Sequence, residues 1–250
     1  MKSISIVGAG PGAIDLMTQK AIKLLKEAEV LVWTDSLIPQ KIIELANKNC
    51  EKIPSSSLTL EEILPLLIKK YKEGKKVVRL HDGDPCLYGA LTEQISRLKN
   101  EGITVEVIPG ISAYQATAAS LQAELTIPGL TQTIILSRAG GRTGTPEKES
   151  LERLAALRSS LCLYLSARHV ESVQETLLNF YPSNTPVAIG YRVSWEDEWL
   201  KVVPLNLMAS TSKEKKFIRT TIYIISPTLG SDNRRSKLYN KSHNHLFRPN

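Results

Sequence analysis

Three short segments of this sequence combine glycine with proline directly after residues typical of β-strands. They are GAGPGA at residues 8–13, HDGDPCLYGA at 81–90 and IPGISA at 108–113. Such combinations favour sharp turns that expose backbone donors and acceptors. Ligands of open α/β sheets collect beyond the carboxyl ends of the strands, so three such turns in the first half of the chain predict a binding cleft.

The first segment, residues 8–13, formally fits the G-x-G-x-x-G/A pattern of dinucleotide-binding proteins. Two features argue against NAD or FAD. The acidic residue expected about 20 residues further on is poorly placed, since Glu29 falls inside the next predicted strand and Asp35 follows that strand. Pro11 also lacks the backbone N–H that would help to hold a phosphate. The pattern alone leaves a nucleotide site and a purely structural turn open.

Charged residues at the predicted strand ends suit a ligand with several charges. Asp84, in the second turn, either forms that turn or pairs with an ammonium or ribose hydroxyls. Basic residues at strand ends of the second half would suit a substrate with several carboxylates, unless they are ordinary solvated side chains. They are Arg138, Arg142, Arg168, His169 and Arg192.

The charge balance favours a small polyanion over nucleic acid. Residues 231–250 contribute +4 of the net charge of +7, which leaves only +3 for the first 230 residues. Three cysteines lie far apart and the histidines are isolated or in the polar tail, so we predict reduced thiols and no metal site. No apolar run approaches the roughly 18–20 residues of a membrane span and no signal pattern begins the chain, so we expect a cytoplasmic protein.

Strand-like and helical patterns alternate along most of the 250 residues, which predicts an α/β protein. The clearest helix spans residues 58–74, with Thr59 and Glu62 as a capping box and Gly74 at its end. The alternation breaks near residues 122–131 and then restarts with more strands. We therefore predict an N-terminal α/β domain over 1–121, a C-terminal α/β domain over 122–230 and a basic polar tail over 231–250.

The segments VGAGPG, GDPCLYGA and IPGISA, in this order and spacing, resemble the tetrapyrrole (corrin/porphyrin) methyltransferase family. Three further stretches, ELTIPGLTQTIILSRAGGRT, YLSAR and YRVSWEDE, resemble the subgroup that methylates carbon 11 of precorrin-4, or of its cobalt form, on the way to cobalamin. The tail also resembles the end of that subgroup. Val193, Glu196 and Cys86 depart from the usual pattern, which leaves details of the pocket open.

The resemblance implies two α/β domains with a cofactor cleft between them and S-adenosyl-L-methionine as the cofactor, with S-adenosyl-L-homocysteine as its product. It also implies a polycarboxylated tetrapyrrole substrate, a homodimer, and no nucleic-acid or membrane partner. A sibling enzyme acting at another macrocycle position is the alternative, and a nucleotide-binding oxidoreductase is a more distant one.

Residues can be carried over from the family position by position. The resemblance implies that Arg142 and Arg168 meet substrate carboxylates, whereas it identifies no general base. The implied cofactor-binding residues are Pro11, Gly83, Asp84, Leu87, Ser112 and Ala113 from the first domain, with Leu165 and Val193 from the second.

Overall fold

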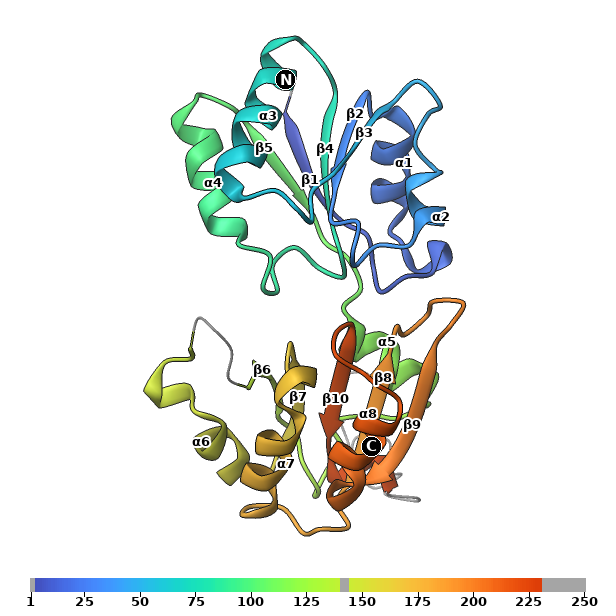
Figure 1. Ribbon diagram of the computed structural model, residues 1–250, viewed down its shortest axis with the longest axis vertical. Helices are drawn as coiled ribbons and strands as arrows, with labels where there is room; N and C mark the ends of the chain where they lie inside the picture. The colour runs from blue at the N-terminus through green and yellow to red at the C-terminus, as the bar shows by residue number, and fades with distance from the viewer. Residues whose placement is uncertain (1–2, 140–143, 231–250) are drawn as a thin grey trace, which may run out of the picture. The chain divides into compact units, whose positions relative to one another are not determined.

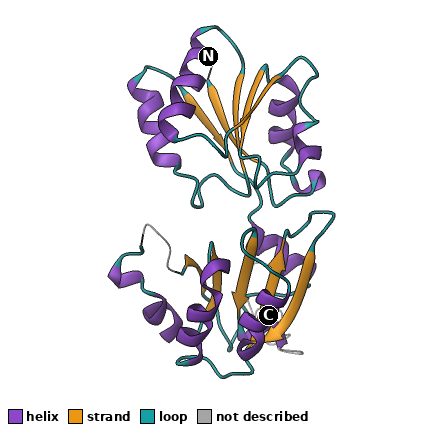
Figure 2. Ribbon diagram, viewed as in Figure 1, coloured by secondary structure: helices purple, strands orange, loops and turns teal. Residues whose placement is uncertain are grey.

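The computed structural model describes residues 3–139 and 144–230. The chain divides into two compact units, each with its own five-stranded sheet. Unit 1 contains residues up to Ala116 together with Arg192–Asp197, and unit 2 contains the remainder. Strands and helices alternate in both units, which confirms the predicted α/β class (Figure 2).

Unit 1 has an entirely parallel sheet with the strand order β3-β2-β4-β1-β5. Helices α1 and α2 lie on one face and helices α3 and α4 on the other (Figure 1). The strands are β1 (Ile4–Gly8), β2 (Val30–Trp33), β3 (Glu51–Pro54), β4 (Val77–His81) and β5 (Val105–Ile108). The helices are α1 (Gln19–Glu27), α2 (Gln40–Ile43), α3 (Leu60–Lys72) and α4 (Leu91–Asn100).

Two apolar layers hold this sheet between its helices. Side chains of β1, β2 and β4 alternate between the faces, so that Val7 and Leu80 pack with α1 and α2 while Ile4 and Val77 pack with α3 and α4. Helix α3 begins with the predicted capping box, in which the Thr59 side chain accepts from the third helical residue and Glu62 accepts from the Thr59 N–H.

Unit 2 has a mixed sheet with the order β6-β7-β10-β8-β9. Only β6 and β7 are parallel, and the remaining pairs are antiparallel. The strands are β6 (Ile134–Arg138), β7 (Ser160–Tyr164), β8 (Pro186–Tyr191), β9 (Trp199–Pro204) and β10 (Thr221–Ile225). The helices are α6 (Leu151–Ala156), α7 (Val170–Leu178) and α8 (Met208–Glu214), whose buried side chains join one apolar core.

Helix α5 (Ala113–Ser120) carries the chain from unit 1 into unit 2, because the division falls between Ala116 and Thr117. The predicted tail over 231–250 lies outside the described residues. None of the helices in the described ranges is both long and apolar enough to cross a membrane.

Candidate functional site

The order of strands in unit 1 places one topological switch point at the carboxyl edge of the sheet. Neighbouring strands β1 and β4 lead to helices on opposite faces, since β1 continues toward α1 and β4 continues to α4 (Figure 1). Ligands of open α/β sheets bind at such a switch point, beyond the carboxyl ends of the strands. The glycine segments at 8–13 and 81–90 follow these two strands.

Backbone atoms of the first two glycine loops pair directly beyond the strands. Gly10 N donates to Gly83 O at 3.1 Å, and Gly83 N donates to Gly10 O at 2.9 Å. Gly10 and Gly83 both have positive φ, 72° and 54°, which glycine adopts without steric cost. The two loops therefore form one continuous backbone surface.

The third glycine loop packs against this pair without any space for side chains. A Cβ on Gly110 would lie 2.0 Å from Gly83 O and 3.0 Å from Gly8 Cα. A Cβ on Gly8 would lie 2.6 Å from Gly110 N. Glycine at these positions is thus required by close contact of the backbones rather than by a binding motif.

Asp84 ties the second loop to the third. Its Oδ1 accepts from the N–H of Cys86 at 2.8 Å, which closes the local turn. Its Oδ2 accepts from the N–H of Gly110 at 2.9 Å. Both carboxylate oxygens thus accept hydrogen bonds from the backbone, and Asp84 connects the second glycine loop to the third.

The segment Arg192–Asp197 belongs to unit 1 through contacts with the first glycine loop. Trp195 Nε1 donates to Pro11 O at 3.0 Å, and Ala13 N donates to Ser194 Oγ at 2.9 Å. Gly12 lies against the indole, since a Cβ there would approach Trp195 Cδ1 to 2.3 Å. Pro11 contributes its carbonyl to these contacts.

Val193 and Arg192 of this segment lie in surroundings that their positions in the sequence do not indicate. Val193 follows β8 of the second half, but it is buried and groups with unit 1. The Arg192 guanidinium pairs with Asp197 and stacks on Trp195, 4.9 Å from the ring centroid. Its charge therefore serves an internal contact as well as any ligand.

The remaining implied cofactor residues of unit 1, Leu87, Ser112 and Ala113, lie in the second and third glycine loops. Leu87 N donates to Asp84 O at 3.1 Å, which continues the turn of the second loop. Ser112 is buried at the start of α5, where its N–H donates to Gln115 Oε1 and its carbonyl accepts from Ala116 N. Ala113 is the first residue of that helix.

Two of the implied residues of the second half, Leu165 and Arg168, follow β7. Leu165 is 64% exposed and has a φ of 53°, and Arg168 is exposed in the short 3-10 helix Ala167–His169. Arg138 ends β6, and its Nη2 donates to Gly144 O at 2.5 Å. Arg142 lies outside the described residues.

Two titratable groups near the loops, His81 and Cys86, are poor candidates for a general base. Burial and the nearby Arg79 guanidinium lower the pKa of His81 to about 4, so its imidazole is neutral at neutral pH. Partial burial and the neighbouring Asp84 raise the pKa of the Cys86 thiol, which keeps it protonated. No group of three or more potential metal ligands occurs in the part of the chain that the structure describes.

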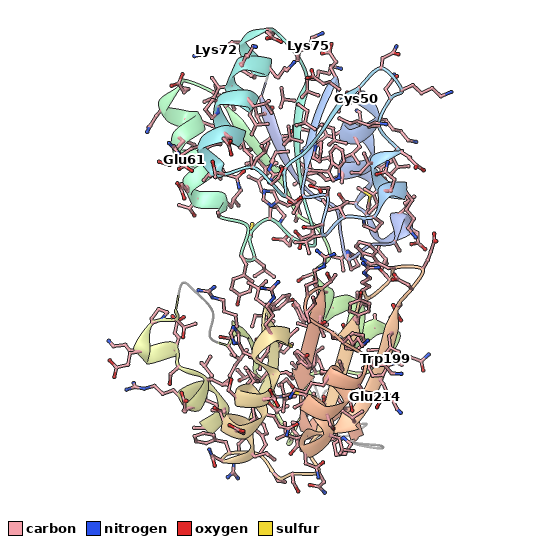
Figure 3. The ribbon with its side chains drawn as sticks, viewed as in Figure 1. Cys50, Glu61, Lys72, Lys75, Trp199 and Glu214 are labelled. Atoms are coloured by element: carbon pink, nitrogen blue, oxygen red, sulfur yellow. The ribbon has the colours of Figure 1, made fainter. Side chains whose placement is uncertain are left out.

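Charged side chains elsewhere on unit 1 are engaged in ion pairs away from these loops. Lys72 pairs with Glu101 at 2.8 Å and Lys75 pairs with Glu29 at 3.4 Å. Figure 3 shows Lys72 and Lys75 at the edge of the sheet where the strands begin, opposite to the glycine loops. These exposed pairs contribute little to stability and nothing to the candidate site.

Comparison with known proteins defines the class. Residues 3–208 match the Tetrapyrrole (Corrin/Porphyrin) Methylases, and the chain belongs to this family. Over 249 residues it is 41% identical to the cobalt-precorrin-4 C(11)-methyltransferase of Methanocaldococcus jannaschii, which covers 99% of this chain and 96% of that protein. It is also 38% identical to the precorrin-4 C(11)-methyltransferase of Pseudomonas aeruginosa, over 99% of both chains.

Solved structures agree with this assignment. A cobalt precorrin-4 methyltransferase described as a cobalamin biosynthetic enzyme superposes with a TM-score of 0.88 at 37% identity, covering 92% of this chain and 96% of the other. A uroporphyrin-III C-methyltransferase from Thermus thermophilus, complexed with S-adenosyl homocysteine, gives 0.75 at 27% identity over 91% and 98% of the two chains.

The backbone surface fits the cofactor that the family uses. In front of Gly83 an added Cβ would meet nothing closer than Ser112 Cα at 3.9 Å and Ile111 O at 4.0 Å, so a flat group can approach the backbone there. An open face of glycine backbone suits the flat base of an adenosine, which can pack against it.

Sequence reasoning missed Trp195 and Ser194 as partners of the first glycine loop. Both lie in the YRVSWEDE stretch, where the sequence pattern singled out Arg192 at a strand end. Their contacts span about 180 positions of sequence, with separations of 184 and 181 residues. A tryptophan beside charged residues at a strand end was the available signal.

Proposed function

We propose that this protein transfers the methyl group of S-adenosyl-L-methionine to carbon 11 of precorrin-4 or cobalt-precorrin-4, giving the precorrin-5 species of cobalamin biosynthesis. The observation that carries the proposal is the set of three glycine loops fused through backbone contacts at the switch point of the parallel sheet. Relatives named for this reaction, at 38–41% identity over nearly the whole chain, support the choice of substrate.

The chain's own contribution to such a reaction is rigid placement. When bound, S-adenosyl-L-methionine supplies an already activated methyl group, so neither a metal ion nor a covalent enzyme intermediate is needed. We infer that Gly83, Ser112 and Ala113 offer the backbone surface for the adenosine, with Asp84 and Leu87 fixing the loop beside it. A carbon nucleophile held in line with the methyl group gains most from this fixed geometry.

Further contacts are proposed from the family resemblance. Pro11 and Val193 complete the cofactor surface of unit 1, and Leu165 contributes an exposed apolar side chain. Arg142 and Arg168 hold substrate carboxylates, for which a guanidinium offers a bidentate fork. His81 and Cys86 are unsuited to accept the substrate proton released after methylation, and we assign no general base.

The decisive experiment incubates the protein with S-adenosyl-L-methionine and precorrin-4, with and without cobalt, and locates the new methyl group by NMR. Methylation at carbon 11 supports the proposal, and the better of the two substrates assigns the route. A methyl group at another carbon identifies a sibling enzyme instead. Calorimetry that shows binding of NAD but not of S-adenosyl-L-homocysteine would overturn the reading as a methyltransferase.

We also propose a homodimer in the cytoplasm, as the family resemblance implies. Light scattering on the purified protein measures the molar mass directly. A mass near 27.7 kDa would correspond to a single chain and would contradict the dimer.

A further inference from the structure

Strained backbone gathers in the loop that follows β4. Tyr88 and Ala90 have φ values of 58° and 48°, a left-handed conformation that side chains with a Cβ rarely adopt. Glycine or asparagine would occupy such positions at lower cost. The loop begins with Gly83 and Asp84, which belong to the backbone surface described above.

A buried clamp fixes the backbone on the C-terminal side of Tyr88. Gln94 of α4 is 2% exposed, and its Nε2 donates to Gly89 O at 2.8 Å. The same Nε2 lies 3.3 Å from Nε2 of His81, which is 7% exposed. Gly89 is also confined from the other side, since a Cβ there would lie 2.5 Å from Pro85 O.

Asp84 fixes the backbone on the other side of Tyr88. Its carbonyl accepts from Leu87 N at 3.1 Å, and its carboxylate accepts from Cys86 N and Gly110 N. The left-handed conformation is therefore maintained by contacts on both sides. Strain that is held by its surroundings in this way concentrates at ligand-binding positions.

The side chain presented by this arrangement is large, aromatic and 47% exposed. Tyr88 thus lies outside the buried apolar clusters and places its ring at the surface from a left-handed position. An aromatic ring can pack against the apolar face of a macrocycle, and its hydroxyl can donate to a peripheral carboxylate.

We propose that Tyr88 is a specificity-determining contact for the tetrapyrrole substrate and that Gln94 is the positioning residue that holds it there. The inference rests on the proposed function, because it takes a tetrapyrrole as the ligand. It adds a residue that the family resemblance did not supply.

Three substitutions at Tyr88 test the contact. We expect Tyr88→Ala to raise the KM for the tetrapyrrole about tenfold, since a stacked ring is lost, while the Kd for S-adenosyl-L-homocysteine stays within about twofold. Tyr88→Phe keeps the ring and should stay within about threefold of the wild type. Leu157→Ala, at a 64% exposed side chain of unit 2 outside these loops, is the matched control and should change nothing.

Tyr88→Gly separates a functional role from a structural one. Glycine relieves the left-handed strain, so the Tm should equal that of the wild type or exceed it by about 2 °C. The KM should nevertheless rise as it does in Tyr88→Ala. A Tm that falls with the KM unchanged would show a packing residue and would overturn the inference.

A double substitution tests the positioning role of Gln94. Gln94→Met removes the hydrogen bond to Gly89 O at similar volume and should raise the tetrapyrrole KM several-fold, roughly threefold or more. In the Tyr88→Gly background it should add no further rise, because its effect passes through Tyr88. An additive effect would remove the positioning role.

Direct binding keeps this inference distinguishable from the proposed function. Fluorescence titration with uroporphyrin III, a polycarboxylated tetrapyrrole, measures the contact without turnover. Weakened binding in Tyr88→Ala supports the inference even if no methyl group reaches carbon 11. Methylation at carbon 11 with equal KM in all Tyr88 variants would sustain the function and refute the contact.

Discussion

The two units of this protein use similar numbers of strands and helices in opposite ways. Unit 1 is wholly parallel, so the loops after β1, β4 and β5 all emerge at one edge and join through their backbones. Unit 2 is mostly antiparallel, so its strand ends are distributed over both edges of the sheet. Two of its candidate binding residues, Leu165 and Arg168, are exposed side chains directly after β7.

This difference suggests a division of labour between fixed backbone and adaptable side chains. A surface made of glycine backbone suits a ligand that is the same in every member of a family. Exposed side chains can change without disturbing a core, so they suit a substrate that differs between members. The contrast predicts large effects on stability and cofactor binding for changes that touch the backbone contacts of the unit 1 loops, and substrate-specific effects for changes in exposed side chains such as Tyr88 and Arg168.

The largest effect is expected for Gly110→Ala. The new Cβ would lie 2.0 Å from Gly83 O, and both partners are backbone atoms that cannot move alone. We expect a loss of about 3–4 kcal/mol in the free energy of unfolding, together with loss of S-adenosyl-L-homocysteine binding. Urea unfolding and calorimetry measure the two quantities.

Gly102→Ala is the matched control for this substitution. Gly102 also has a positive φ, 72°, but a Cβ there meets nothing within 4 Å. Gly102→Ala should lower the free energy of unfolding by only about 1 kcal/mol and leave cofactor binding intact. Equal losses for the two variants would show that the close packing of the three loops is not what holds this site.

The second effect concerns the dependence of stability on pH. The buried His81 has its pKa lowered to about 4, whereas an unfolded histidine titrates near 6.5. Between these values the unfolded chain binds a proton that the folded chain does not, so stability falls as the pH falls from about 6.5 to 4. We expect His81 to account for ~3 kcal/mol of this loss, with full stability restored above pH 6.5.

Denaturant unfolding at several pH values measures the slope, and His81→Gln removes the titrating group. Between pH 4 and 6.5 the free energy of unfolding of His81→Gln should change less with pH than that of the wild type. His169, which is exposed, provides the control through His169→Gln. If both variants keep the slope of the wild type, the acid sensitivity arises elsewhere.

The third effect is expected at Asp84. Asp84→Ala removes the acceptors of the Cys86 and Gly110 N–H groups, so both stability and S-adenosyl-L-homocysteine affinity should fall by about 2–3 kcal/mol. Asp84→Asn keeps one acceptor oxygen and should lose about half as much. Affinity lost with stability unchanged would mean that Asp84 touches the ligand without bracing the loops.

The alternation of elements could be predicted because it depends on local pattern. The capping box of Thr59 and Glu62 identified the start of α3, and the three glycine turns marked the ends of β1, β4 and β5. Strand β3 was missed because it is an edge strand with charged, exposed residues. Helix α8 was missed because it is rich in serine, threonine and alanine and shows no clear apolar stripe.

The contacts between loops of the candidate site could not be predicted from the sequence. The hydrogen bond from Gly110 N to Asp84 depends on β4 and β5 lying on the two sides of β1. The pairing of Gly10 with Gly83 depends on β4 lying next to β1. That order follows from packing of the whole sheet, whereas local residues specify only that a strand exists. The grouping of Val193 with unit 1 depends in the same way on the distant contacts of Trp195 and Ser194.

The smallest effect on stability and cofactor binding is expected at Arg168, and it separates the two units most sharply. Arg168 is exposed after β7, so Arg168→Gln should change the free energy of unfolding and the affinity for S-adenosyl-L-homocysteine by less than about 0.5 kcal/mol. Its guanidinium would meet a substrate carboxylate in a solvated setting, where one ion pair contributes about 0.2–1 kcal/mol. We therefore expect a rise of up to about fivefold in the tetrapyrrole Kd, larger at low salt because salt screens solvated charges.

Arg153→Gln, on the exposed face of α6, is the control and should leave both affinities unchanged. Titration of each variant with a tetrapyrrole and with S-adenosyl-L-homocysteine gives the comparison. If Arg168→Gln weakens the binding of both ligands equally, this side chain of unit 2 does not discriminate substrate from cofactor. The proposed contrast between fixed backbone and exposed side chains would then be wrong.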